Sequence, residues 1–361
     1  MKRMFLLVIA LVVTMALLAG CAGTTVVINE CTCPVEGHTP AVTEPEDVLD
    51  SVEVPEGQVK TGLAVFTNVS DSVSATQEEE GKIQYDLTIA AVTVDDKGVI
   101  RSCTIDSVPA SVAVDATGAI TSDLNAQIKT KNEQGADYGM VAWGGAIAEW
   151  DEQVKALCDY AVGKTVDELK NGAIDETGKA PAGSDLASSA TIYLGGYVSA
   201  IEAAANNAQT LGAEAGDQLT LVTLSSLGSS TAATADAAGN AQLDVNIAAI
   251  TSNNGVITSC IIDAVQAKVG FDATGTITAD LSAAIPTKNE LGENYGMVAW
   301  GGAIAEWNEQ AAAFAAYVTG KTAQEVAGIA VSEGKPADSD LASSVTISIG
   351  DFQALIAKAF A

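Results

Sequence analysis

The sequence predicts an α+β protein with two tandem copies of one domain, each an antiparallel sheet with packed helices. The segment YGMVAWGGAIAEW occurs at 138–150 and again at 295–307, an offset of 157 residues. Alternating apolar segments joined by a glycine turn precede each occurrence, and apolar residues at helical spacing follow it. This offset is too long for a solenoid unit and suits a whole domain.

Other positions keep the same offset. Cys103 aligns with Cys260, and the segment TKNE at 130–133 aligns with its repeat at 287–290. We therefore expect one domain at 61–205 and the second at 218–361, joined near 206–218.

The chain begins with the features of a bacterial lipoprotein signal at 1–20. A basic start, MKR, precedes a short apolar run, and small residues lead to Cys21. We expect cleavage before Cys21, whose thiol takes a diacylglycerol, and acyl chains bind membranes. An ordinary secretory signal or an uncleaved anchor are the alternatives. We expect an extracytoplasmic protein that is lipid-anchored to the cell membrane.

Residues 21–60 are predicted to form a disordered tether. Four prolines lie among acidic and small residues, without helical or strand periodicity. Cys31, Cys33 and His38 lie in this segment, but a zinc site needs a fourth ligand, so no metal is expected. A local disulfide or two free thiols is the preferred interpretation.

The composition is strongly acidic. The chain has 17 basic and 46 acidic residues, a formal net charge of −29. Such a surface repels nucleic acid and anionic lipid, so no nucleic-acid partner is expected. It attracts cations and basic proteins, although an acidic surface also serves solubility alone.

The first copy begins with strand patterns. We expect a strand at 83–94, a turn at 95–98 and a return strand at 99–108. Residues 114–120 read as a short hairpin with Gly118 at its turn. Cys103 and Cys260 occupy equivalent strand positions, so buried thiols are preferred over a bridge between them.

Helical patterns follow. An apolar stripe with steps of three and four residues predicts a helix from Trp143 to Ala161, which Gly163 ends. Thr165 and Glu168, and their counterparts Thr322 and Glu325, form capping boxes that start a second helix. A strand is then expected at 190–194, and terminal helices near Gly196 and Asp351.

The domains lack familiar catalytic patterns. The only histidine is in the tether, which excludes Ser-His-Asp and Cys-His sites from both copies. Neither Gly144-Gly145 nor Gly195-Gly196 has the spacing of a dinucleotide fingerprint. Glu149 and Glu152 are expected on a solvated helix face.

The segment DLASSAT at 185–191 recurs as DLASSVT at 340–346. Here the chain resembles the bacterial FMN-binding domain family, in particular the two-domain flavinylated lipoproteins of Gram-positive extracellular electron transfer. The resemblance covers nearly everything from about Gly62 onward. It implies that a separate FMN transferase, using FAD, joins FMN to Thr191 and Thr346 as phosphodiesters. Asp185 and Asp340 would be the recognised acids.

The motif departs from the family pattern at one or two places in each copy. In that family the motif reads Asp, two residues, Ser or Thr, Gly, Ala, then Thr or Ser. Its glycine position is Ser189 in the first copy and Ser344 in the second, and its alanine position is Ala190 and Val345. The motif serines and nearby aromatic residues complete the expected site: Ser188, Ser189, Ser343, Ser344, Tyr138, Trp143, Tyr295 and Trp300. For the tryptophans, packing in the core of the helix stripe is the alternative to flavin contact.

The resemblance implies an electron carrier more than an enzyme. Covalent FMN would relay electrons from a membrane donor to extracellular acceptors. The alternative is a surface lipoprotein whose two α+β domains bind a ligand or polymer and have lost the flavin.

Overall fold

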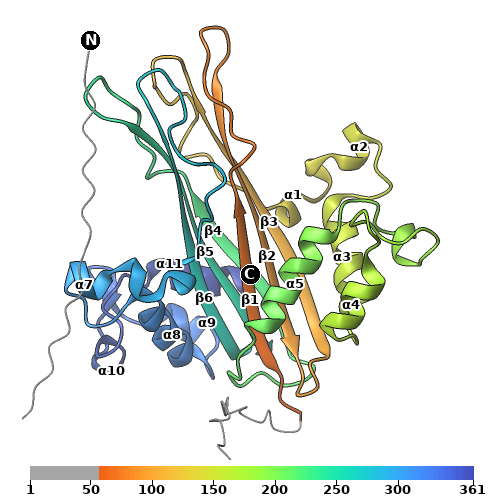
Figure 1. The fold of residues 1–361 in the computed structure, drawn as a ribbon. Helices are drawn as coiled ribbons and strands as arrows, with labels where there is room; N and C mark the ends of the chain where they lie inside the picture. The colour runs from red at the N-terminus through yellow and green to blue at the C-terminus, as the bar shows by residue number, and fades with distance from the viewer. Residues whose placement is uncertain (1–56) are drawn as a thin grey trace, which may run out of the picture. The chain divides into compact units, whose positions relative to one another are not determined.

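The computed structural model describes residues 57–361. The predicted signal, Cys21 and nearly all of the tether lie outside the described residues. The fold is mixed α+β, with antiparallel sheets at the centre and helices packed against them (Figure 1). Within 57–361, no helix is both long and apolar enough to cross a membrane.

Each copy contributes a three-stranded antiparallel sheet in which chain neighbours pair. The strands predicted at 83–94 and 99–108 are confirmed, and β3 extends beyond the predicted end. An additional strand that the pattern did not show precedes them in each copy. The strands are β1 (Lys60–Asn68), β2 (Gly81–Val94) and β3 (Ile100–Val114), then β4 (Gln218–Ser226), β5 (Gly239–Asn253) and β6 (Val256–Phe271).

The helices of the two copies correspond in order. The first copy has α1 (Lys131–Gln134), η1 (Gly135–Tyr138), α2 (Met140–Gly144), α3 (Trp150–Ala161), α4 (Val166–Ala173), η2 (Leu186–Ser188) and α5 (Gly195–Asn206). The second has α6 (Lys288–Leu291), η3 (Gly292–Tyr295), α7 (Met297–Gly301), α8 (Trp307–Val318), α9 (Ala323–Ala327), α10 (Ser339–Ala342) and α11 (Gly350–Ala359). A small hairpin, β7 (Val331–Ser332) and β8 (Lys335–Pro336), precedes α10.

Strand alternation produces three hydrophobic cores. Successive side chains of a strand point to opposite faces of its sheet. In β2, Ile83, Tyr85 and Leu87 enter a core shared by both sheets, whereas Ala90 and Val92 enter a core with the first copy's helices. A third core lies between the second sheet and its helices. The two sheets therefore pack face to face, with helices on their outer sides (Figure 1).

The two copies also exchange reciprocal hydrogen bonds. The amide of Ala75 donates to the carbonyl of Gly275 at 3.0 Å, and the amide of Ala233 donates to the carbonyl of Gly118 at 2.9 Å. Both glycines have φ near +70°, and a Cβ on either would lie within 3.0 Å of a backbone oxygen of the other copy. Each copy thus donates one of these hydrogen bonds and accepts the other, as in a twofold interface.

Local signals are confirmed where they depend on neighbouring residues. Both capping boxes form, with Thr165 and Thr322 as N-caps. The hairpin at 114–120 closes through a bridge between Val114 and Ile120, and Gly163 follows α3 with φ +85°. The terminal helices begin at Gly195 and Gly350.

Two predicted elements are wrong. The helix expected from Trp143 begins only at Trp150, because Gly144 ends α2 and Glu149 caps the start of α3. The strand expected at 190–194 is irregular chain between η2 and α5. Its amides find a side-chain acceptor in place of a neighbouring strand, as described below.

Candidate functional site

The segment 185–191, here called the first motif loop, is anchored by two apolar side chains. Leu186 and Ala190 are buried, whereas Asp185, Ser188 and Ser189 are exposed. The second motif loop, 340–346, repeats this arrangement, with Leu341 and Val345 buried and the acid and both serines exposed. The alanine-to-valine change therefore falls on a core position, away from solvent.

The serines that replace the family's glycine are compatible with the fold. Ser189 has φ −118°, outside the left-handed region that favours glycine. The preceding serine is held locally: Ser188 Oγ donates to the carbonyl of Asp185 at 2.6 Å, and Ser343 Oγ to that of Asp340 at 2.7 Å. The backbone itself thus places no requirement for glycine at Ser189.

Each motif threonine is bound to a buried glutamine. The amide and the hydroxyl of Thr191 lie 2.8 and 3.3 Å from Gln153 Oε1. For Thr346 and Gln310 Oε1 the distances are 2.8 and 3.2 Å. Both glutamines are fully buried, yet Thr191 is exposed and Thr346 half-buried. Each hydroxyl is therefore held at the end of a rigid support.

The same glutamine supports a second loop. The side-chain amide of Gln153 donates to the carbonyl of Ala148 at 2.8 Å, and Gln310 donates to Ala305 at the same distance. The residues 139–149 and 296–306, here called the aromatic loops, are thus tied to the motif loops. The signal for these glutamines in the sequence is their recurrence at equivalent positions, next to the apolar residues of each helix stripe.

A buried glutamate organises each aromatic loop. Glu149 accepts from the amides of Met140 and Val141 at 2.8 and 3.0 Å, and Glu306 accepts from Met297 and Val298 at the same distances. These amides are the free donors at the start of a helix. Glu149 is only 7% exposed, so its expected place on a solvated helix face is wrong.

The aromatic loops present large apolar side chains to solvent. Trp143 is 89% exposed and Trp300 is 90% exposed. Each indole lies so close to a glycine, Gly139 or Gly296, that a Cβ there would come within 2.3 Å of it. The alternative interpretation, that Trp143 and Trp300 pack in the core of the helix stripe, is therefore wrong. The apolar residues exposed beside them are Val141, Ile147, Val298 and Ile304.

The two predicted tyrosines, Tyr138 and Tyr295, are half-buried and each lies beside a lysine. Lys131 Nζ is 5.1 Å from the ring centroids of Tyr138 and Trp150. The second copy repeats this with Lys288, 4.9 Å from Tyr295 and from Trp307. Ammonium groups over aromatic faces are attracted by the ring quadrupole. The repeated TKNE segment thus places a cation beside each tryptophan that starts α3 or α8.

A buried aspartate anchors that lysine's helix. Asp263 accepts from the amides of Asn289 at 3.1 Å and Ala264 at 2.7 Å, and burial raises its pKa to about 6. Asp106 occupies the equivalent position in the first copy, and burial raises its pKa too. The TKNE segment therefore occupies the same place in both copies, because the amide of its asparagine binds this buried aspartate.

A groove of about 610 Å³ lies beside the second motif loop. Ligand pockets commonly have volumes of about 300–1,000 Å³. The residues directly after Thr346 line the groove, together with the cation and aromatic rings named above. Its lining includes Ile347, Ser348, Trp307, Phe352, Gln266, Lys288 and the two acidic residues Asp244 and Asp351. An aromatic ligand attached at Thr346 would find an apolar wall there, with the Lys288 ammonium and the carboxylates of Asp244 and Asp351 around it.

No known protein family, curated protein or solved structure matches this chain. Within residues 57–361, no group of three or more His, Cys, Asp or Glu side chains could hold a metal ion.

Proposed function

We propose that this protein is a membrane-anchored extracytoplasmic flavoprotein that relays electrons to extracellular acceptors. FMN is carried as phosphodiesters on Thr191 and Thr346, one in each copy, with 61–205 and 218–361 as the two flavin domains. Lipid on Cys21 holds the protein at the membrane, and residues 21–60 form the tether.

One observation carries this proposal. In both copies a buried glutamine holds the motif threonine with its carbonyl oxygen and the aromatic loop with its amide. A hydroxyl at the protein surface and an exposed tryptophan therefore share one support. A covalent aromatic cofactor needs this pair: an accessible attachment atom and an apolar side chain that can contact its ring.

The attachment chemistry uses the threonine oxygen as nucleophile. A transferase of the FMN-transferase class would move FMN from FAD to the threonine hydroxyl. A Thr–O–P bond forms, AMP leaves, and the hydroxyl proton passes to the transferase. The exposed Asp185 and Asp340 begin the motifs and are the acids that such an enzyme would recognise.

The chain's residues also suit the attached group. Lys288 brings a positive charge to the groove beside Thr346 and could pair with a phosphate group, although Asp244 and Asp351 line the same groove. Bound FMN supplies one- or two-electron transfer, and the protein sets its exposure and surroundings. With a net charge of −29, the protein favours cationic acceptors such as ferric species or basic proteins.

The test is covalent flavin on the full-length chain. The chain would be produced with an FMN transferase and FAD, denatured, and examined for flavin fluorescence in a gel. We expect a fluorescent band that requires the transferase and is absent from the double variant Thr191→Ala/Thr346→Ala. A colourless chain under all conditions would reject the proposal.

A second candidate is a surface lipoprotein that binds a ligand or polymer without flavin. The exposed apolar side chains around Trp143 and Trp300 favour it, because contiguous apolar surface often marks a binding site. The same gel separates the two functions. This candidate predicts a colourless protein that retains its fold.

A further inference from the structure

We infer that Cys103 and Cys158 form a disulfide in the mature protein, which joins strand β3 to helix α3 in the first copy. The second copy cannot form this bond, because Ala315 occupies the position that corresponds to Cys158. In the second copy the equivalent positions, Cys260 and Ala315, face each other.

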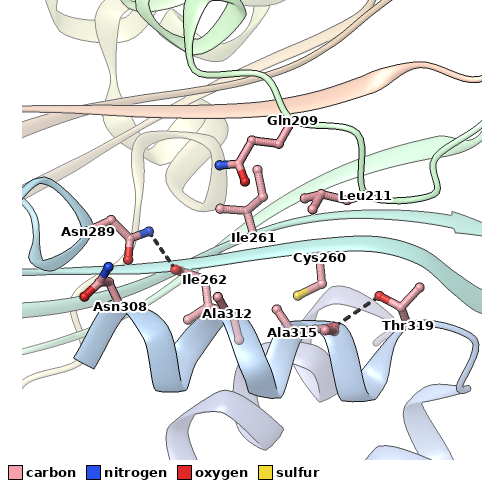
Figure 2. Close-up of a pocket in the computed structure, with 11 residues that line it drawn as sticks. Gln209, Leu211, Cys260, Ile261, Ile262, Asn289, Asn308, Ala312, Ala315 and Thr319 are labelled. Carbon is pink, nitrogen blue, oxygen red and sulfur yellow. Dashed lines mark hydrogen bonds between the residues drawn. The ribbon is translucent and has the colours of Figure 1, made fainter. Parts of the chain in front are cut away.

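Cys260 and Ala315 line the same pocket, whose volume is about 470 Å³. Figure 2 shows Cys260 pointing from β6 toward the helix α8 that carries Ala315. In the repeat, Cys260 corresponds to Cys103 and Ala315 to Cys158. The fold therefore places these two positions opposite each other across a strand–helix interface.

The first copy has a sulfur at both positions. Cys158 is buried in the hydrophobic core between the first sheet and its helices, and Cys103 packs against the same core. The neighbouring Cys158 thiol, and burial, raise the pKa of the Cys103 thiol well above its usual range. Both cysteines are free thiols in the structure and lie at the same core, next to each other.

The bond forms by thiol–disulfide exchange. The two thiols lose two protons and two electrons to the disulfide of an oxidoreductase or of oxidised glutathione, which becomes two thiols. Extracytoplasmic compartments permit this reaction, whereas the cytosol keeps thiols reduced. This step rests on the predicted lipoprotein signal and not on flavin. Because Cys158 is buried in the folded chain, exchange takes place during folding.

The experiment uses the full-length chain purified from membranes in detergent. Free thiols are alkylated under denaturing conditions, and the unreduced protein is digested with trypsin. Cleavage after Arg101 and Lys129, and after Lys155 and Lys164, isolates each cysteine in its own peptide. We expect a linked pair, 102–129 with 156–164, whose mass is the sum of both peptides less two hydrogen atoms. Cys260 should be found alkylated.

Two variants provide matched controls from the other copy. Cys158→Ala reproduces the second copy's arrangement, so it should fold and lose the linked pair. Ala315→Cys reproduces the first copy's arrangement and should link position 315 to Cys260.

Separate alkylated peptides from the membrane-derived protein would overturn the inference. If oxidised glutathione links the two cysteines in a second sample that has not been alkylated, the predicted compartment is at fault; if it does not, the pairing is. Neither result depends on whether flavin is attached.

Discussion

The two copies share one framework but differ at the surfaces that a ligand would meet. The bonds from Gln153 and Gln310 to the motif threonines agree within 0.1 Å, and those from Glu149 and Glu306 to the aromatic loops are the same. Around the groove, by contrast, the second copy's Gln266, Ser348 and Asp351 correspond to Pro109, Tyr193 and Gly196. The support is thus preserved while the surroundings diverge.

The tryptophans that start α3 and α8 show the divergence most clearly. Trp150 donates from its indole to the hydroxyl of Tyr197 at 2.9 Å. Its counterpart Trp307 packs edge-on against Phe352, with ring centroids 5.9 Å apart. The first copy therefore holds its aromatic pair with a polar bond, and the second leaves an apolar wall beside its groove. Two flavins on this chain would meet different environments.

The largest expected effect concerns the cysteine difference. A disulfide that closes a loop of about 55 residues stabilises a chain by about 4 kcal/mol in the chain-entropy account. Cys158→Ala should lower the unfolding free energy by about that amount without reductant. With reductant, the variant and the natural chain should differ by much less. Urea denaturation under both conditions measures this, and equal losses in both would contradict the bridge.

The next effect tests the shared framework. Glu149→Gln replaces the charged acceptor of two amides and should cost about 1.5–3 kcal/mol, as for hydrogen bonds to charged groups. Glu306→Gln should cost the same within about 0.5 kcal/mol, because the contacts are equal. Denaturant unfolding of both variants gives the comparison. Clearly unequal costs would show that the two aromatic loops are supported differently.

The buried carboxyl of Asp263 should make the stability of the chain depend on pH by a similar amount. The pKa of Asp263 in the folded chain, about 6, lies above the ordinary value of 3.8. The folded state therefore binds this proton more tightly, and stability should fall as pH rises from about 4 to about 6, by about 2–3 kcal/mol. Asp263→Asn should remove this slope when variant and natural chain are compared at each pH. A slope that persists in the variant would assign the effect to other groups.

The smallest expected effect concerns the exposed tryptophans. Trp143→Ala should change stability by less than about 0.5 kcal/mol, because the side chain is almost fully exposed. In flavinylated protein it should nevertheless raise flavin fluorescence, since a nearby indole quenches it. Trp150→Ala, which empties a core position, is the contrasting variant and should destabilise by about 3–5 kcal/mol. Unchanged fluorescence in Trp143→Ala would place the flavin away from the aromatic loop.

The sequence predicted what neighbouring residues determine. The strand at 83–94 and the capping box of Thr165 follow from local patterns, and both are present. The spacing of Trp143 and Trp150 was misleading, because a seven-residue interval suits a helix even where Gly144 and Gly145 interrupt it. Periodicity alone could not show that interruption.

The support of the candidate site could not be predicted in the same way. Gln153 and Thr191 are 38 residues apart, and only the packing of α3 against the motif loop joins them. A strand was expected at 190–194 because its residues are β-branched or apolar, yet the glutamine takes the place of a partner strand. Likewise, Glu149 resembled any surface carboxylate until the amides that it accepts from were known.

The central claim is tested most directly by the site of flavin attachment. The full-length chain, produced with an FMN transferase and FAD, would be digested and its peptides weighed, for the natural chain and for Thr191→Ala and Thr346→Ala. We predict one FMN on the peptide of each motif threonine, with each variant losing only its own adduct. Unmodified peptides at both threonines, with the transferase active on a known substrate, would contradict the account.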